Sequence, residues 1–259
     1  MRHAFVFLIG AASLAQTPPV ENAKLETRAL SESLGKALAR IPGTAWAGYE
    51  MPAHGRSQFG CWNGDGVNIS HKGTAYLEGD KTFRLLFRLV DGVVDKLRIV
   101  SPGCTLDAGG LAIVWFTGVK PEESVTYLAG LLGQARRHSE VLAALAQHEA
   151  PNAVPALLKA AKENSSGKIR GDALFWMSQR AGEQLSAAIK ASVENDPETD
   201  VKRKAVFALS QLPKDEGVPL LIELAKSNKN SEVRKQAVFW LGQSNDPRAF
   251  QFIEQVLTH

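Results

Sequence analysis

One segment of the sequence, residues 200–211, recurs at a fixed distance on both sides. A similar segment stands thirty-two residues later, at 232–243, and another thirty-two residues earlier, at 168–179. All three have alanine, phenylalanine and a final glutamine at equivalent positions. A period of about 20 to 50 residues is typical of proteins built from stacked structural repeats. The sequence therefore predicts a repeat architecture for the C-terminal half.

The period extends over four units, each with two helices. Gln147 precedes the three later glutamines with the same spacing, and Leu157, Ile189, Leu221 and Ile253 keep register in the second helices. The first helices are apolar on most sides, which indicates that neighbouring helices cover them. We expect helices at residues 122–132, 139–147, 153–163, 168–180, 183–194, 198–212, 217–227, 231–243 and 247–257.

The chain before residue 119 has a different character, with dense glycine and many β-branched and aromatic residues. At residues 83–89, large apolar residues at every second position alternate with Arg84, Leu86 and Arg88, which predicts a strand. Asp91-Gly92 separates it from a second run at 93–100, a strong hairpin signal. Further strands are expected at residues 67–70, 74–77 and 111–116, and an amphipathic helix at 25–41. The predicted fold class is a small α+β domain, residues 25–118, with an antiparallel sheet and a helix, followed by helical repeats over 119–259.

The N-terminus has the pattern of a secretory signal peptide. Arg2 precedes an apolar run at 4–12, and Ser13 and Ala15 supply small residues for cleavage. This run is shorter than the roughly 20 residues that span a bilayer. We expect a signal peptide over residues 1–15, a flexible lead-in over 16–24 and export to the periplasm or the exterior. The alternative is an ordinary buried N-terminal helix.

The chain has two cysteines, Cys61 and Cys104. In an exported protein, an even pair is most simply a disulfide. A zinc site formed with His54 and His71 is the alternative, but the spacing contains no tight ligand pair. We therefore expect a disulfide, and neither a metal nor a cofactor.

The charge distribution gives no sign of a nucleic-acid partner. The net charge is +3, and lysine and arginine are spread along the chain instead of forming a basic stripe. After the leader, no apolar segment is long enough to cross a membrane. We expect another protein as the partner.

No sequence motif identifies a catalytic site. Ser70-His71 lacks the Gly-x-Ser-x-Gly context of a nucleophile elbow. An enzyme or small-ligand binder remains the alternative function, with a cleft between the α+β domain and the first repeats. His71, Asp107 and His138 are the candidate cleft residues. Residues 107–110 could form a tight binding loop, but a Gly pair more often only permits an unusual turn, and we favour the turn.

The pattern Val233-Arg234, Ala237 and Leu241-Gly242, with a second helix that begins like residues 218–221, resembles HEAT-like repeats. It is most similar to the short bacterial kind first associated with phycobilisome lyases. The resemblance covers residue 139 to the C-terminus and implies an α-solenoid that binds proteins. Residues 107–110 also resemble a segment of exported bacterial proteins of unknown role that end in HEAT repeats.

Two sets of repeat positions are candidates for partner binding. Arg170, Lys202 and Arg234 are equivalent bases. The resemblance implies that such a base forms a ladder with acids of adjacent repeats, and we favour this interpretation over a basic binding row. Trp176 and Trp240 could be interface anchors, but core packing is favoured.

The resulting functional hypothesis is an exported, non-catalytic protein–protein interaction module or scaffold at the bacterial cell envelope. Repeat stacks present extended surfaces to partners. The recurring apolar residues of the first helices are expected to form the core. Any function of the repeats is therefore expected at the more variable positions of the second helices.

Overall fold

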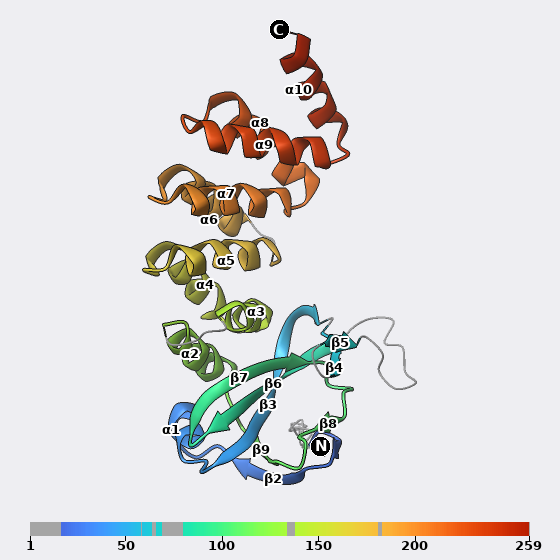
Figure 1. Ribbon diagram of the computed structural model, residues 1–259, viewed down its shortest axis with the longest axis vertical. Helices are drawn as coiled ribbons and strands as arrows, with labels where there is room; N and C mark the ends of the chain where they lie inside the picture. Colours follow the sequence, from blue (N-terminus) through green and yellow to red (C-terminus); the bar gives the residue numbers. More distant parts are fainter. Residues whose placement is uncertain are drawn as a thin grey trace, which may run out of the picture.

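The structure is a computed structural model that describes residues 17–57, 59–63, 66–68, 80–133, 138–180 and 183–258. Among these residues, a five-stranded sheet lies at one end of the molecule. A stack of helices continues from it to the C-terminus (Figure 1). The predicted order, an α+β region followed by helical repeats, is confirmed.

The strand order of this sheet is β2-β9-β3-β6-β7. The bounds are Lys24–Ala29 for β2, Thr44–Ser57 for β3, Asp80–Val90 for β6, Val93–Val100 for β7 and Ala112–Thr117 for β9. β3, β6 and β7 pair antiparallel, but β9 runs parallel to both β2 and β3. The sheet is therefore mixed, and the antiparallel prediction is correct for three strands only. Residue alternation indicates a strand, whereas its direction depends on how the chain travels between strands.

The turn between β6 and β7 confirms the predicted hairpin. Asp91 and Gly92 have φ angles of 48° and 75°, as a primed two-residue turn requires. A Cβ atom on Gly92 would also collide with the backbone of Ala39, at the end of helix α1 (Leu34–Ala39). Glycine is thus needed here for both its φ angle and its small size.

The helix predicted at residues 25–41 is wrong over its first half. Residues Lys24 to Ala29 form β2 and pair with six consecutive residues of β9. Only α1 remains helical, with Leu34 and Leu38 buried. The apolar spacing fits a helix, but pairing along β9 satisfies the backbone of β2 and overrides that local preference. The lead-in is not wholly irregular either, because β1 (Val20–Glu21) pairs with β8 (Leu106–Asp107).

The central strand β3 was not predicted from the sequence. Its alternation is interrupted by Gly48 and Pro52, and Gly48 is needed because a Cβ atom there would lie 2.6 Å from Leu86 Cδ2. The strand expected at 67–70 overlaps β5 (Gly66–Asn68), which pairs with β4 (Cys61–Asn63). The strand expected at 74–77 lies outside the described residues.

All nine predicted helices are confirmed to within a few residues. Their bounds are Pro121–Leu131 (α2), His138–Gln147 (α3), Ala153–Glu163 (α4), Gly167–Ser178 (α5), Glu183–Asn195 (α6), Thr199–Ser210 (α7), Lys214–Ser227 (α8), Ser231–Gln243 (α9) and Pro247–Thr258 (α10). The first helices of the repeats, α3, α5, α7 and α9, stack on one another, and α4, α6 and α8 form a second layer (Figure 1). The starts of α5, α7 and α9 are each thirty-two residues apart, in agreement with the sequence period.

One hydrophobic core runs from the sheet into the repeats. Tyr49, Phe83 and Phe87 on one sheet face belong to the same buried cluster as the helices up to α10. The sheet therefore covers the N-terminal end of the stack, which would otherwise expose apolar side chains.

The opposite face of the sheet carries a second, smaller core around Leu86, Ile113 and Trp115. The predicted disulfide between Cys61 and Cys104 is present and joins β4 to the segment after β7. Cys104 is buried in this second core.

Candidate functional site

A groove of about 690 Å³ opens between α4 and α6, in the layer of second helices. Leu158 and Ala161 of α4 and Ala188 of α6 line it with apolar surface, while Lys162 and Asn195 lie among its polar lining residues. Arg170 and Asp196 also line it. Largely apolar concavities with a few fixed polar groups are the usual form of binding sites.

The repeat period explains why this groove is open. At the next interface, between α6 and α8, Lys190 Nζ lies 2.8 Å from Glu223 Oε1 and the pair bridges the two helices. Thirty-two residues earlier, the equivalent positions are Leu158 and Ala191. The bridge is therefore replaced by one apolar and one very small side chain, which leaves the space between the helices unfilled.

Two further positions of α6 are small where α8 has bulk. Ala188 corresponds to Leu220, and Ser192 corresponds to Leu224, which is buried. Both Ala188 and Ser192 line the groove. The groove thus follows from apolar or small side chains on α4 and α6, at positions where the next interface has an ion pair or larger side chains.

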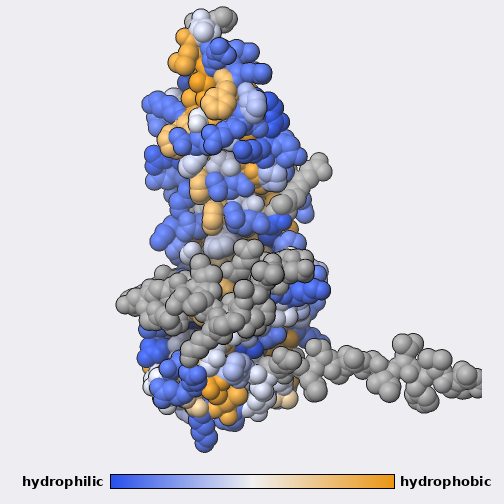
Figure 2. All heavy atoms as spheres, turned by 90° about the vertical axis from the view of Figure 1, so that its right-hand side faces the viewer, coloured by the Kyte–Doolittle hydropathy of each residue, from blue (hydrophilic) through white to orange (hydrophobic). Residues whose placement is uncertain are grey.

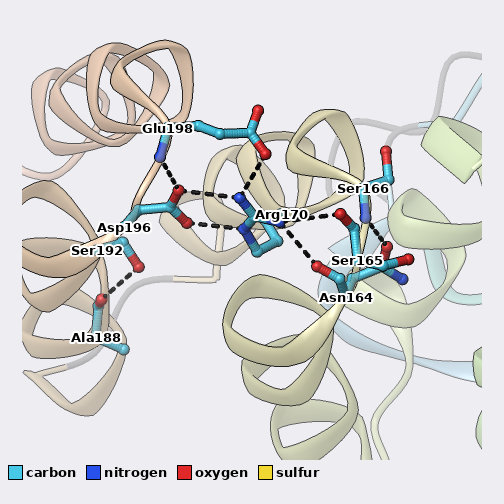
Figure 3. Close-up of polar contacts among 8 residues, drawn as sticks. All are labelled: Asn164, Ser165, Ser166, Arg170, Ala188, Ser192, Asp196 and Glu198. Atoms are coloured by element: carbon cyan, nitrogen blue, oxygen red, sulfur yellow. Dashed lines mark hydrogen bonds and ion pairs between the residues drawn. The ribbon is translucent and has the colours of Figure 1, made fainter.

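Arg170 fixes the end of the groove by joining two loops (Figure 3). Its Nε and Nη2 donate to the two carboxylate oxygens of Asp196 at 2.8 and 3.0 Å, and Nη2 also donates to Glu198. Its Nη1 donates to the carbonyls of Asn164 and Ser165. All five N–H groups of the guanidinium are therefore used within the protein.

Burial and charge pairing decide the protonation states of this pair. Arg170 is 7% exposed and Asp196 is 9% exposed. Burial alone would raise the pKa of Asp196, but hydrogen bonds from Arg170 and from the Glu198 backbone hold that pKa below its usual value. The hydrogen bond to Asp196 raises the pKa of Arg170. Both groups are charged near neutral pH, and their bidentate contact rigidly links the repeats beside the groove.

The two bases equivalent to Arg170 perform part of the same role. Lys202 Nζ donates to the carbonyl of Glu194, and Arg234 Nη1 donates to those of Asn228 and Lys229. A cation near the C-terminal end of a helix stabilises its unpaired carbonyls. Of the three bases, Arg170 is the one for which the described contacts include an acid of the following repeat.

The two predicted tryptophan anchors lie in the layer of first helices, away from the groove. Trp176 packs edge-to-face on Phe175, and Phe175 stacks on Phe207 with ring centres 5.9 Å apart. Trp240 continues the series against Phe207 at 4.9 Å. Figure 2 shows hydrophobic side chains over the C-terminal helices and in a broken line along the stack. Both tryptophans are partly buried against the core, so much of their surface is used inside the protein.

The three predicted cleft residues are not brought together. His71 lies outside the described residues. Asp107 is exposed on β8, where its carboxylate accepts a hydrogen bond from the Gly109 amide of its own turn. His138 begins α3, and its Nε2 lies 2.8 Å from Asp172, which also binds Lys204. β8 and α3 lie well apart (Figure 1).

A serine and a histidine do meet at the junction of sheet and repeats, but both are fully buried. Ser124 Oγ lies 2.8 Å from His148 Nε2 and 2.8 Å from the Tyr49 hydroxyl. His148 Nδ1 lies 2.7 Å from the carbonyl of Ala144, so Nδ1 carries the proton and donates it. Nε2 then accepts from Ser124, which in turn accepts from Tyr49. A substrate cannot reach this chain, and its role is to join β3, α2 and α3.

The electrostatics of His148 agree with that structural role. Burial lowers its pKa from 6.5 to about 4, against the hydrogen bond to Ala144, which raises it. The ring of Phe83 contacts the imidazole edge-to-face at 5.0 Å. The imidazole is therefore neutral at ordinary pH.

Within the described ranges, no three His, Cys, Asp or Glu side chains are grouped as a metal site. Across the same residues, no helix is long and apolar enough to cross a membrane.

Residues 185–259 match the family model of HEAT repeats. The helical half is a HEAT-like repeat region. The match begins within α6 and runs through α10, and the described helices before it keep the same two-layer stacking. A search of curated proteins found no match to the chain. HEAT repeats generally mediate interactions between proteins, so a protein partner is the expectation for these repeats.

The groove was not predicted from the sequence, although two differences between the repeats indicate it. Comparison of the second helices position by position shows Leu158 against Lys190 and Ala191 against Glu223. At such positions the side chains do not make the contact that the equivalent residues of the next repeat make.

Proposed function

We propose that this protein is an exported, non-catalytic protein-binding module at the bacterial cell envelope, and that the groove between α4 and α6 holds a segment of its partner. The groove itself is the observation that most directly supports this proposal. It opens where three side chains of α6 are smaller than their equivalents in α8. At the next interface, between α6 and α8, the equivalent positions are bridged by Lys190 and Glu223 or carry the larger side chains of Leu220 and Leu224.

The lining of the groove indicates the chemistry of that segment. Leu158, Ala161 and Ala188 offer apolar contact, so the partner should contribute apolar side chains. Lys162 lines the groove, is exposed, and has no ion-pair partner among the described residues. An acidic residue beside the apolar anchors would complement it.

The same geometry argues against the row of bases as the primary binding surface. Arg170 is nearly inaccessible and all its donors are used. Lys202 and Arg234 also hold carbonyls of their own repeats. These side chains support the shape of the surface, and the groove-lining residues make the contact.

Export is supported by the leader pattern and by the disulfide between Cys61 and Cys104. Structural disulfides persist in oxidising compartments. Residues 1–16 lie outside the described residues. Fractionation of the native host and N-terminal sequencing test this part: we expect a mature chain that begins at Gln16 outside the cytoplasm, whereas a cytoplasmic protein with an intact leader would contradict export.

The groove can be closed by introducing the ion pair that already bridges α6 and α8. Leu158→Lys with Ala191→Glu recreates the ion pair that bridges α6 and α8, at positions of similar exposure. The variant should therefore fold normally. The matched control is the reverse change at the next interface, Lys190→Leu with Glu223→Ala.

Binding is measured with a defined probe, a peptide selected from a random library on the wild-type protein, and with crosslinking to envelope extracts. We expect selected peptides to carry apolar anchors and the closing variant to lose affinity by roughly tenfold or more, while the control variant stays within about twofold of wild type. Equal binding by the closing variant, or no selected peptide and no crosslinked protein at all, would reject the groove as the partner site.

A further inference from the structure

Helix α10 has apolar side chains on its solvent side as well as on its buried side. Ala249 and Phe252 are buried where α10 packs on α8 and α9. Phe250 and Leu257 are 57% and 80% exposed, and Ile253 is only partly buried. Residues three and four positions apart are neighbours on one side of a helix. Phe250, Ile253 and Leu257 therefore form an exposed apolar stripe along α10.

The stripe has the chemistry that would complement the groove between α4 and α6. Glu254 is exposed beside the stripe, one helical turn after Phe250. In the groove, Leu158 and Ala161 offer apolar surface, and Lys162 is an exposed cation on the same helix. An apolar contact flanked by opposite charges favours one docking register over others.

The stripe and the groove also agree in length. The lining on α6 extends from Ala188 to Asn195, and the stripe extends from Phe250 to Leu257, a separation of seven positions in each case. At about 1.5 Å per residue, both are about 10 Å long. The alanine and serine side chains of the α6 wall would allow another helix to approach closely, because the distance between packed helices depends on the side chains at their contact.

Within one molecule the stripe does not reach the groove. α10 packs on α8 and α9 at the end of the stack far from the sheet, whereas α4 and α6 lie nearer the sheet (Figure 1). The α10 stripe can therefore enter a groove of this kind only in another molecule.

We propose that the apolar stripe of α10 docks in the groove between α4 and α6 of a second copy of this protein. The inference rests on the groove of the proposed function, where α10 and the partner segment exclude each other. The stripe lies against Leu158 and Ala161, and Glu254 pairs with Lys162. Each copy offers one helix and one groove, so the contact is heterologous and generates a closed ring or an open chain. Self-association regulates partner binding, because copies that are assembled have their grooves filled.

Sedimentation of the purified protein measures self-association between about 1 μM and about 1 mM, the range of weak affinities. We expect the average mass of wild type to rise with concentration. The groove-closing variant, Leu158→Lys with Ala191→Glu, and a stripe variant, Phe250→Gln with Leu257→Gln, should each associate roughly tenfold more weakly or less. Val93→Gln is the control for loss of an exposed apolar side chain, since Val93 is 70% exposed on β7 and belongs to neither surface. It should associate like wild type.

Mixing the two weakened variants tests which surfaces meet. The groove-closing variant keeps its stripe, and the stripe variant keeps its groove. We expect the mixture to form a complex of one copy of each, which grows no further because neither remaining surface is intact. Pairing of α10 with α10 would instead leave the groove-closing variant self-associating, and that result would overturn the proposal.

Exchange of the two charges tests the register on positions that are exposed. Lys162→Glu and Glu254→Lys should each weaken association by roughly twofold to fivefold, and the two changes together should restore it. Lys159→Glu is the matched control, because Lys159 is exposed on α4 and lies outside the groove lining. It should not restore association to Glu254→Lys. This exchange keeps the proposal testable even if the groove-closing variant does not fold.

A wild-type protein that stays monomeric at about 1 mM, or weakened variants that stay monomeric when mixed, would overturn self-association through this groove. If wild type is monomeric and selected peptides still bind the groove, self-association fails and the proposed function stands. If association requires the groove but no peptide or envelope protein is captured, the proposed function fails and self-association stands.

Discussion

Lowering the pH from 7.5 to 5 is expected to destabilise the junction between the sheet and the repeats through one side chain, His148. Its pKa is about 4 in the folded protein and 6.5 when exposed. Between these values the unfolded chain binds a proton that the folded chain does not. The free energy of unfolding must therefore fall as the pH falls through this window, and it is unaffected by His148 above about pH 7.

The size of the effect follows from the two pKa values. One unit of pKa difference corresponds to about 1.4 kcal/mol. The full effect is about 3 kcal/mol, of which about 2 kcal/mol is lost between pH 7.5 and pH 5. The physical cause is that a charged imidazole cannot be solvated among Phe83, Ser124 and Tyr49, and its Nε2 would then donate where it now accepts from Ser124.

Two measurements check this prediction. The ring signals of His148, followed by NMR, should titrate with a midpoint near 4. Urea unfolding at both pH values should show the loss in wild type and not in His148→Gln, once the shared pH dependence of other groups is subtracted. His54→Gln is the matched control, since His54 is exposed at the same junction and its backbone carbonyl accepts a hydrogen bond there, from Gln147.

The reasoning would be refuted by a titration of His148 with a midpoint near its ordinary value of 6.5. It would be refuted equally by a loss of stability in His148→Gln as large as that of wild type. A loss confined to His54→Gln or shared by all three proteins would assign the pH dependence to other groups.

Two further predictions concern stability. Cys61→Ala with Cys104→Ala should lower the free energy of unfolding by about 4 kcal/mol, because the disulfide closes a loop of 43 residues; unfolding of wild type with and without reductant measures this, and an unchanged midpoint would contradict it. Arg170→Met should cost about 3 kcal/mol or more, because it leaves Asp196 buried and unpaired. Arg234→Met, which removes contacts to carbonyls only, should cost about 1 kcal/mol in the same assay, and equal losses would contradict a special role for the buried ion pair.

The helical half could be predicted almost completely from the sequence. A thirty-two residue period places each helix relative to its neighbours, and the first helices recur as apolar segments because the stack buries them. The hairpin at Asp91-Gly92 and the pairing of Cys61 with Cys104 were equally predictable. In each of these cases local chemistry or a repeated contact leaves few alternatives.

The sheet could be predicted only in part. Residues Lys24 to Ala29 fit a helix by spacing, and they form a strand because β9 offers six partners from a distant part of the chain. The direction of β9 and the course of β3 across Gly48 likewise depend on contacts that are far apart in sequence. Propensity is too weak to resist such pairing.

The two hollows of the surface also differ in how far the sequence predicts them. In the sequence, the groove between α4 and α6 is indicated by Leu158 and Ala191, which stand where the next repeat has Lys190 and Glu223. The stacking of the helices in the tertiary structure shows that these residues leave a space between α4 and α6. A cavity beside the disulfide between Cys61 and Cys104 has no local sequence pattern, since strands β3, β6, β7, β8 and β9 each contribute a part of its lining. Sequence alone determined which residues repeat, because each repeat meets the same neighbours. The tertiary structure decided which residues meet across the sheet, because those contacts join segments that no local rule connects.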